Sequence, residues 1–363
     1  MSRGSHQFVH PNGAPLVSPD ARRQRRSWSR SINARSRPES YDHPFTPLVF
    51  LVAGMPDFLT IFATRSTKGW CLFGENGEVD REVRVDPALG TVVHVVGNRQ
   101  SRPNLATNTS TSTCPFCVGG LEAPEPYDVR SFVNRWPPMP DDRCEVILYT
   151  SDHNASFGSL SIEQATKVID LWAERTSQLA ARADVDYVLV FENRGAEVGA
   201  TISHPHGQIY AYDHVPERPR QLFANNWAPD ETADRVINSN SEWTSFVPFA
   251  SIYPTAVTVA PRQRVGNLTS LSTKQRLELA AMLIETINRL DHLFETPLPY
   301  MMWINQQPAN GLVEDAWMSI EIVSPWRQKG LARFIAAAEV GAGEYFNPVV
   351  PEQLAEKLRS ISQ

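Results

Sequence analysis

Two segments of this chain follow the same order of elements about 111 residues apart, and this repeat limits the folds that the chain can adopt. Each segment has a helix pattern that begins Ser-x-x-Gln, a strand pattern that ends in asparagine, and one further strand pattern. The helices begin at Ser161 and Ser272, and the strands end at Asn193 and Asn305. Because repeated units bury their apolar faces together, we expect a duplicated α+β fold. Each half would be a mostly antiparallel sheet with a packed helix, and the two would form one continuous fold.

Apolar patterns predict the elements within this repeat. Short runs rich in β-branched residues predict strands at 47–55, 59–63, 91–96, 145–150, 187–192, 208–212, 256–260, 300–305 and 318–323. Ser161 with Gln164 and Ser272 with Gln275 predict capping boxes at two helix starts. A third helix is expected from Pro351. The expected units are a tail over 1–44, a first half over 45–240 that carries the chemistry, and a second half over 241–363.

The segment 1–44 differs in composition from the rest of the chain. Its run Arg22-Arg23-Gln24-Arg25-Arg26 is basic, and the surrounding residues are rich in serine and nearly free of acids. This composition predicts a disordered tail or a translation start placed too far upstream, with Met55 as one candidate start. The alternative is a targeting segment, because transit peptides share this arginine- and serine-rich composition.

Charge and cysteine usage exclude several functional classes. The formal net charge of the 363 residues is −6, so we expect no nucleic-acid partner. No apolar run reaches the roughly 20 residues of a membrane-spanning helix, so we expect no membrane partner. The chain has four cysteines, which is too few for a disulfide framework. A reducing cytoplasm, where thiolates can bind a metal, is the predicted location.

Two cysteines and two histidines form a candidate zinc site. Cys114 and Cys117 form a C-x-x-C, His153 lies in a polar loop, and His204 begins a His-x-His. Two sulfurs and two imidazole nitrogens are a usual tetrahedral zinc set, and four protein ligands leave no open position for substrate. We therefore predict one structural Zn²⁺. The alternative is a pair of buried thiols and two unrelated histidines.

His206 follows His204 at the alternate position, which places both imidazoles on one face of an extended strand. An imidazole attacks phosphorus well at neutral pH when a hydrogen bond fixes its other nitrogen, and a backbone carbonyl is the expected partner. Gly207 is expected to permit close approach of the backbone to a ligand. Gln208 shares the face of His206, and its neutral amide can donate to a phosphoryl oxygen.

The segments Cys-Pro-Phe-Cys, Asp-His, Phe-Glu-Asn-x-Gly and His-Pro-His-Gly-Gln, in this order, resemble the galactose-1-phosphate uridylyltransferase family of the histidine triad superfamily. The resemblance covers roughly Arg84 to Arg359, and it implies that the two halves are histidine-triad-like. It implies transfer of UMP between a UDP-sugar and a sugar 1-phosphate through a uridylylated histidine at His206. Gln208 would hold the phosphoryl oxygen where hydrolases of the superfamily carry a third histidine, so glutamine favours transfer. Family members are commonly homodimers.

The same resemblance assigns the substrate-binding side chains. Arg99 and Arg102 match a phosphate-binding R-x-x-R-P segment, and arginine forks suit phosphate oxygens. Asn193 matches an asparagine on the phosphate side, and Asn134 matches one that binds the nucleoside. Thr201 stands where the family often has serine. The segment that contacts the hexose corresponds here to Arg333, Phe334 and Glu339.

Two departures from the family leave the substrate open. Many members bind a second metal through an H-x-H-x-E strand, where this chain has Trp317, Ser319 and Glu321, so we expect no second metal through the missing histidines. Alanines before Glu339 replace larger side chains near the sugar. Alternatives are therefore a relative that uses another sugar phosphate or a GDP- or ADP-sugar, and a nucleotide-sugar phosphorylase. An inactive zinc-stabilised binding protein is a further alternative, although it would have no need of the nucleophile at His206.

Overall fold

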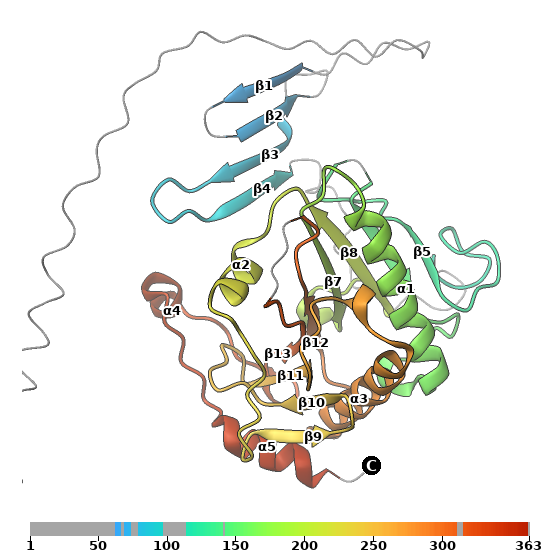
Figure 1. Ribbon diagram of the computed structural model, residues 1–363, viewed down its shortest axis with the longest axis vertical. Helices are drawn as coiled ribbons and strands as arrows, with labels where there is room; N and C mark the ends of the chain where they lie inside the picture. The colour runs from blue at the N-terminus through green and yellow to red at the C-terminus, as the bar shows by residue number, and fades with distance from the viewer. Residues whose placement is uncertain are drawn as a thin grey trace, which may run out of the picture.

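The computed structural model describes residues 62–66, 69–73, 79–96, 114–140, 142–310 and 315–361. Its centre is one sheet of nine strands, in the order β5-β6-β8-β7-β12-β13-β11-β10-β9, in which every neighbouring pair is antiparallel (Figure 1). The strands are β5 (Arg130–Val133), β6 (Cys144–Leu148), β7 (Tyr187–Arg194), β8 (His206–Tyr212), β9 (Val236–Ser239), β10 (Trp243–Phe246), β11 (Thr255–Pro261), β12 (Tyr300–Asn305) and β13 (Ser319–Ser324).

Two long helices, α1 (Ile162–Ala180) and α3 (Thr273–His292), cover one face of this sheet and pack against each other (Figure 1). Each helix has an apolar stripe, which includes Trp172 on α1 and Leu283 on α3, and both side chains are fully buried in the main core. Burying such stripes against the apolar face of the sheet is the main favourable term in a fold of this kind. The opposite face, which carries the half-buried side chains of β8, is the open face of the sheet.

Smaller elements surround this two-layer body. The strands β1 (Phe62–Ser66), β2 (Gly69–Phe73), β3 (Val79–Val85) and β4 (Val92–Val96) form a separate antiparallel sheet. The short helices are α2 (Glu217–Ala224), α4 (Ala337–Ala342) and α5 (Pro351–Ser360), and β14 (Trp326–Gln328) pairs with β15 (Leu331–Ala332). Helix α5 buries Leu354 and Leu358 in the main core, whereas α4 lies at the periphery (Figure 1).

The two expected halves meet in the middle of the sheet. There β7 pairs with β12, and Phe191 lies opposite Trp303. Gln208 on β8 lies opposite Phe191 on its other side, just as Glu321 on β13 lies opposite Trp303. The sheet is therefore continuous across both halves. Strand β9, which lies within the expected first half, pairs with β10 of the second.

The structure confirms most of the predicted elements. The strands predicted at 300–305 and 256–260 correspond to β12 and β11, and helices begin after Ser161, after Ser272 and at Pro351. The capping box at Ser272 is complete. At Ser161 it is half formed, because the Gln164 amide instead donates to the carbonyls of Asp128 and Tyr149 at 2.9 and 2.7 Å.

Some predictions lie outside the described residues. These are the tail over 1–44, the strand over 47–55, and the phosphate-binding candidates Arg99 and Arg102. Within the part of the chain that the structure does describe, no helix is both long enough and apolar enough to cross a membrane.

Candidate active site and metal cluster

The strand β8 presents the candidate catalytic residues on the open face of the sheet. Its side chains alternate between half-buried and fully buried positions along the strand. His206 and Gln208 belong to the half-buried set, whereas Ile209 packs in the core beneath the helices. The period of two in the sequence therefore places both polar side chains on the same face.

A cluster of four potential metal ligands lies next to the start of β8. The ligand atoms of Cys114, Cys117, His153 and His204 all lie within 4.8 Å of one another. The Nδ1 atom of His204 is 3.8 Å from the Cys114 sulfur and 3.6 Å from the Cys117 sulfur, and His153 Nδ1 is 3.4 Å from the Cys117 sulfur. The four residues come from three separate segments, so a metal ion bound here would join them.

The surroundings of His204 are those of a metal ligand. Its Nε2 atom donates to the carbonyl of Thr150 at 2.8 Å, which leaves Nδ1 toward the two sulfurs. Such an outer hydrogen bond is the usual way in which a protein fixes the orientation of a ligating imidazole. Burial lowers the pKa of His204, which favours the neutral ring that binds a metal.

The two thiols would become thiolates only next to a cation. Burial, together with the adjacent Cys114, raises the pKa of Cys117 to about 11. Two thiolates at this position therefore need a positive charge between them, which a metal ion supplies. The donor set, its spacing and its outer hydrogen bond all fit a metal ion.

The imidazole of His206 is fixed in one tautomer by the backbone. Its Nδ1 atom lies 2.8 Å from the carbonyl oxygen of His204. A carbonyl oxygen can only accept, so Nδ1 carries the hydrogen and the basic lone pair belongs to Nε2. The ring of Phe116 packs edge-on against the imidazole at a centroid distance of 5.1 Å. The residue that supplies the cluster with a nitrogen thus also holds His206 through its own carbonyl.

A chain of hydrogen bonds fixes the orientation of the Gln208 amide. The backbone N–H of Trp136 donates to Asn134 Oδ1 at 2.9 Å, so the Asn134 nitrogen must point away from Trp136. That nitrogen donates to Gln208 Oε1 at 3.1 Å. The hydroxyl of Tyr210 lies 3.5 Å from the same oxygen. The oxygen of Gln208 is therefore held as an acceptor, and its NH₂ group is the part of the amide that can donate to a substrate.

Packing within the protein requires a glycine at position 207. A Cβ atom at this position would lie 2.3 Å from the hydroxyl oxygen of Tyr149 and 3.1 Å from the carbonyl oxygen of Phe191. Both contacts lie on the helix-covered side of β8, opposite the face that carries His206. The close approach at Gly207 is thus made by the protein's own core.

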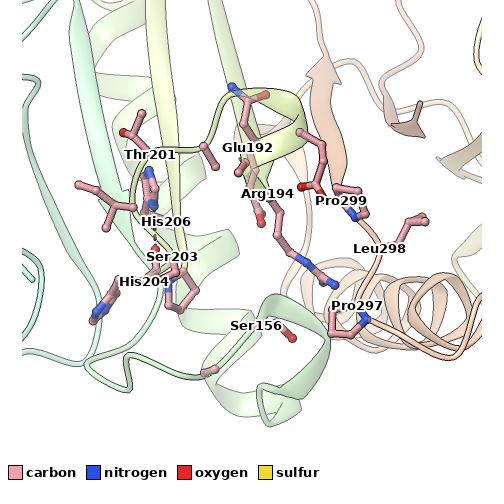
Figure 2. Close-up of a pocket in the computed structure, with 18 residues that line it drawn as sticks. Ser156, Glu192, Arg194, Thr201, Ser203, His204, His206, Pro297, Leu298 and Pro299 are labelled. Carbon is pink, nitrogen blue, oxygen red and sulfur yellow. Dashed lines mark hydrogen bonds between the residues drawn. The ribbon is translucent and has the colours of Figure 1, made fainter. Parts of the chain in front are cut away.

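A cavity of about 300 Å³ opens beside His206 (Figure 2). Its lining combines His206 with Asn193 and Thr201, two of the residues predicted to bind substrate. Figure 2 shows His204 and His206 on one side of this cavity and Pro297–Pro299 on the other. Gly195 begins the loop above it with φ +98°, and a Cβ there would lie 2.7 Å from Pro299. Glycine is therefore needed where this loop turns.

Two charged residues that line the cavity, the buried Glu192 and the half-buried Arg194, were not predicted from the sequence. Glu192 accepts a hydrogen bond from the Tyr300 hydroxyl at 2.8 Å, and burial raises its pKa to about 7. Arg194 forms an ion pair with Asp291 and lies over the ring of Tyr300. The sequence could have indicated the burial of Glu192. Alternation along β7 places Glu192 on the same face as the apolar, buried Val188 and Val190.

The predicted hexose-contacting residues lie apart from this cavity within the chain. The Glu339 carboxylate accepts the backbone N–H groups of Ala336 and Phe346 at 2.8 Å, and it pairs with Arg333. These bonds hold together the segment around α4. Phe334 is 83% exposed. None of the three predicted residues, Arg333, Phe334 and Glu339, lines the cavity next to His206.

The open face of the second half carries an ion pair at the position that matches Gln208. Arg218 of α2 donates to both oxygens of Glu321, at 2.8 and 2.6 Å, and its guanidinium lies over the ring of Trp303. Asn305 donates to Glu321 at 2.7 Å and to the Ser319 hydroxyl at 3.1 Å. Glu321, which the sequence left as a remnant of a metal motif, is therefore bonded to side chains of this chain.

Comparisons with known proteins agree with this geometry. The family model for the N-terminal domain of galactose-1-phosphate uridyl transferase matches residues 139–216, and the model for its C-terminal domain matches residues 199–363. A galactose-1-phosphate uridylyltransferase of Thermotoga maritima is 33% identical over 315 residues, which cover 77% of this chain and 98% of the relative. One of Streptomyces lividans is 34% identical over 312 residues, with coverages of 77% and 87%.

A solved structure of a uridylyltransferase superposes with a TM-score of 0.68 at 26% identity, and it covers 77% of this chain and 97% of that one. The sheet, the paired helices and the histidine motif thus define a transferase-type fold shared with these proteins. The chain belongs to the galactose-1-phosphate uridylyltransferase family.

Proposed function

We propose that this protein transfers a uridylyl group between a UDP-sugar and a sugar 1-phosphate, with His206 as the nucleophile and galactose 1-phosphate as the default acceptor. The observation that carries this proposal is the hydrogen bond from His206 Nδ1 to the His204 carbonyl, which puts the basic lone pair on Nε2. The names of the relatives support the substrate pair.

The proposed reaction has two displacement steps at one phosphorus atom. In the first, the His206 Nε2 lone pair forms a bond to the α-phosphorus of the UDP-sugar, and the bond to the β-phosphate oxygen breaks to release sugar 1-phosphate. In the second, a phosphate oxygen of another sugar 1-phosphate attacks the uridylyl group and the phosphorus–nitrogen bond breaks. Both leaving groups are stable at neutral pH, so positioning and charge stabilisation carry most of the catalysis.

The neighbouring side chains would position the phosphate. Gln208 would donate its NH₂ to a phosphoryl oxygen, and Asn134, expected on the nucleoside, would orient that amide through the bond described above. Asn193 and Thr201 line the same cavity and are suited to bind phosphate oxygens. Arg99 and Arg102 would add positive charge. Arg333, Phe334 and Glu339, which lie apart from this cavity within the chain, would contact the sugar from the partner subunit of the homodimer proposed below.

We infer that the metal of the four-residue cluster is a single structural Zn²⁺. A tetrahedral site with two thiolates and two imidazoles is typical of zinc and has no open position for substrate. Cys114, Cys117, His153 and His204 would hold the ion. Its bound charge would stabilise the two thiolates and keep the segment that leads into β8 in place.

We also infer that the two halves of the sheet derive from a duplication and that only the first, within 45–240, kept the chemistry. The pairs Phe191–Gln208 and Trp303–Glu321 occupy matching positions on either side of the β7–β12 contact. Both helices begin after a serine whose side chain caps the helix. The second half, within 241–363, would then shape the sugar site.

A homodimer in the cytoplasm is the assembly that these features favour. Phe334, Val340 and Phe346 of the segment around α4 are 70% or more exposed, and exposed apolar groups of this kind mark protein interfaces. The cysteines Cys114, Cys117 and Cys144 form no disulfide, which suits a reducing compartment. Light scattering of the purified chain would show the mass of a dimer, whereas a monomer mass would contradict the assembly.

Trapping the intermediate tests the reaction. The protein is mixed with UDP-glucose without acceptor, quenched and digested, and the peptide that contains His206 is analysed by mass spectrometry. We expect this peptide to gain the mass of one uridylyl group and to lose it when galactose 1-phosphate is added. Parallel reactions with GDP- and ADP-sugars identify the base. An unmodified His206 peptide with every donor would contradict the proposal.

A further inference from the structure

The second half of the sheet has a cavity of its own. It holds about 320 Å³, enough for one ring system with part of its substituent. The floor is the open face of β11, β12 and β13, with Thr258, Trp303 and Glu321, and Trp227 and Tyr253 complete the aromatic lining. Ligand cavities are usually concave, largely apolar and furnished with a few polar groups, and this cavity has that character.

The position of this cavity matches that of the catalytic region in the first half. Gln208 lies opposite Phe191 on β7 and opposite Val146 on β6. Glu321 in the same way lies opposite Trp303 on β12 and opposite Thr258 on β11. The cavity therefore lies over Glu321 in the second half at the place where the face with His206 lies around Gln208 in the first half.

The polar groups of the cavity define what it can bind. The indole N–H of Trp303 is buried and has no acceptor among the described residues. The Arg218 guanidinium is an additional donor, and the Glu321 carboxylate is an acceptor. Arg218 and Glu321 neutralise each other, so the cavity favours a neutral ligand. A flat ring with carbonyl acceptors on either side of an N–H donor is complementary to these groups and can stack on the aromatic walls.

We propose that this cavity binds the base of a nucleoside with two carbonyl acceptors flanking a ring N–H. We choose uridine because the proposed substrate is a UDP-sugar, so this choice rests on the proposed function. Binding here leads to no transfer, because Ser319 occupies the position on β13 that His206 occupies on β8. Because the two cavities are separate, the second-half cavity would bind a nucleoside while the cavity beside His206 holds substrate.

The Trp303 indole N–H provides a direct measurement. The full chain is labelled with nitrogen-15 tryptophan, and the Trp303 signal is assigned with Trp303→Phe. Uridine is then titrated into the protein, with galactose 1-phosphate as a parallel ligand. We expect a saturable downfield shift of the Trp303 indole proton with uridine and none with the sugar phosphate, because the indole gains a carbonyl acceptor.

Leu222 of α2 lines the cavity, and Leu277 of α3 is a half-exposed leucine that does not. Leu222→Trp should fill the cavity and abolish the shift, whereas the matched Leu277→Trp should keep it. Tyr253→Leu, which removes one aromatic wall, should weaken the binding about tenfold. Uridylyl transfer should persist in all three variants.

An unchanged Trp303 signal up to saturating uridine would overturn the proposal, and so would an equal shift with the sugar phosphate or an unaltered shift in Leu222→Trp. The proposed function fails separately. If His206 accepts no uridylyl group but Leu222→Trp still abolishes the uridine shift, the cavity assignment holds while the reaction is wrong.

Discussion

The two halves of the sheet share their architecture but differ in what stands on the open face. At matching register positions the first half has His206 and Gln208, and the second has Ser319 and Glu321. Gln208 is held with its oxygen as acceptor and its NH₂ group available, whereas Glu321 is bonded by Arg218 and Asn305. One framework therefore supports a face with an available amide donor and a face whose carboxylate is held by an internal ion pair.

The same contrast appears two residues before each strand begins. His204 donates its ring Nε2–H to the carbonyl of Thr150, and Trp317 donates its indole N–H to the carbonyl of Pro261, at 2.8 and 2.9 Å. The far side of the His204 ring faces two sulfurs, whereas Arg264 lies over the face of the Trp317 ring at 5.6 Å. Each half thus has a ring anchored to a carbonyl, with a cluster of potential metal ligands beside His204 and a cation–π contact at Trp317.

The largest expected difference between the halves is catalytic. His206→Gly should lower the rate of uridylyl transfer by roughly 10⁴-fold or more, because the nucleophile is lost. Ser319→Gly, at the matching position, should change the rate less than about threefold. Steady-state assays with UDP-glucose and galactose 1-phosphate compare the two variants. Equal losses in both would show that the halves do not divide the chemistry in this way.

The second-largest expected difference is in stability and metal content, between the four-residue metal cluster and the contact of Arg264 with Trp317. Cys117→Ser should reduce the bound metal from about one ion per chain to a small fraction and lower the free energy of unfolding by several kcal/mol. Arg264→Ala, which removes the cation–π contact, should cost about 1 kcal/mol and leave the metal content unchanged. Elemental analysis and thermal melting provide both readouts. Full metal content in Cys117→Ser would exclude this cysteine as a ligand.

Glu192 should make the stability of the protein depend on pH. The second half has Ile304 at the matching position, which cannot titrate. The pKa of buried Glu192 is raised from 4.5 to about 7, so the folded protein binds this proton more tightly than the unfolded chain. The unfolding free energy should therefore fall as the pH rises from 4.5 to 7 and stay lower above it, by up to about 3 kcal/mol. Glu192→Gln should flatten this profile in denaturant titrations. A variant with the wild-type slope would show that another group titrates.

The contact between Gly207 and Tyr149 can be tested by a double-mutant cycle. Gly207→Ala should destabilise the fold by about 2 kcal/mol, because the new methyl group meets the Tyr149 hydroxyl. Much of that loss should disappear in a Tyr149→Phe background, where the hydroxyl is absent. The second half has the buried Ile320 at the matching position, so the constraint is local to the first half. An additive cycle in urea unfolding would contradict it.

The smallest expected effect concerns the orientation of Gln208. Asn134→Asp keeps an acceptor for the Trp136 N–H but removes the donor to Gln208, so the rate of transfer should fall about tenfold with little change in stability. In a Gln208→Ala background the same substitution should have almost no effect, because there is no amide to orient. A tenfold loss that persists without Gln208 would instead indicate direct contact of Asn134 with the nucleoside.

Much of this site could be predicted from the sequence because its signals are local. The alternation along β8 places His206 with Gln208, and the small number of residue types that bind zinc limits the choice of ligands. The contact between Asn134 and Gln208 could not be predicted, because it joins residues 74 positions apart. The reason for Gly207 was missed in the same way, since Tyr149 reaches it from a neighbouring strand.

The missed elements have a physical explanation. The strands β5, β9 and β10 have four residues each, which is too short for a clear period of two. The strand β4 was predicted, but only from its β-branched residues. Its first three side chains are all exposed, so it has no alternation of buried and exposed positions. The capping box at Ser161 is half formed because the partners of Gln164 lie in other segments, at Asp128 and Tyr149.

His204 has one consequence that reaches beyond its own ring. Its imidazole faces the thiols while its carbonyl oxygen accepts the hydrogen bond of His206 Nδ1, so one peptide unit would link a bound ion to the proposed nucleophile. A shortage of the metal should therefore first produce a chain that is still folded but catalytically silent. Such a chain would make the rate of sugar-nucleotide exchange follow the supply of the ion.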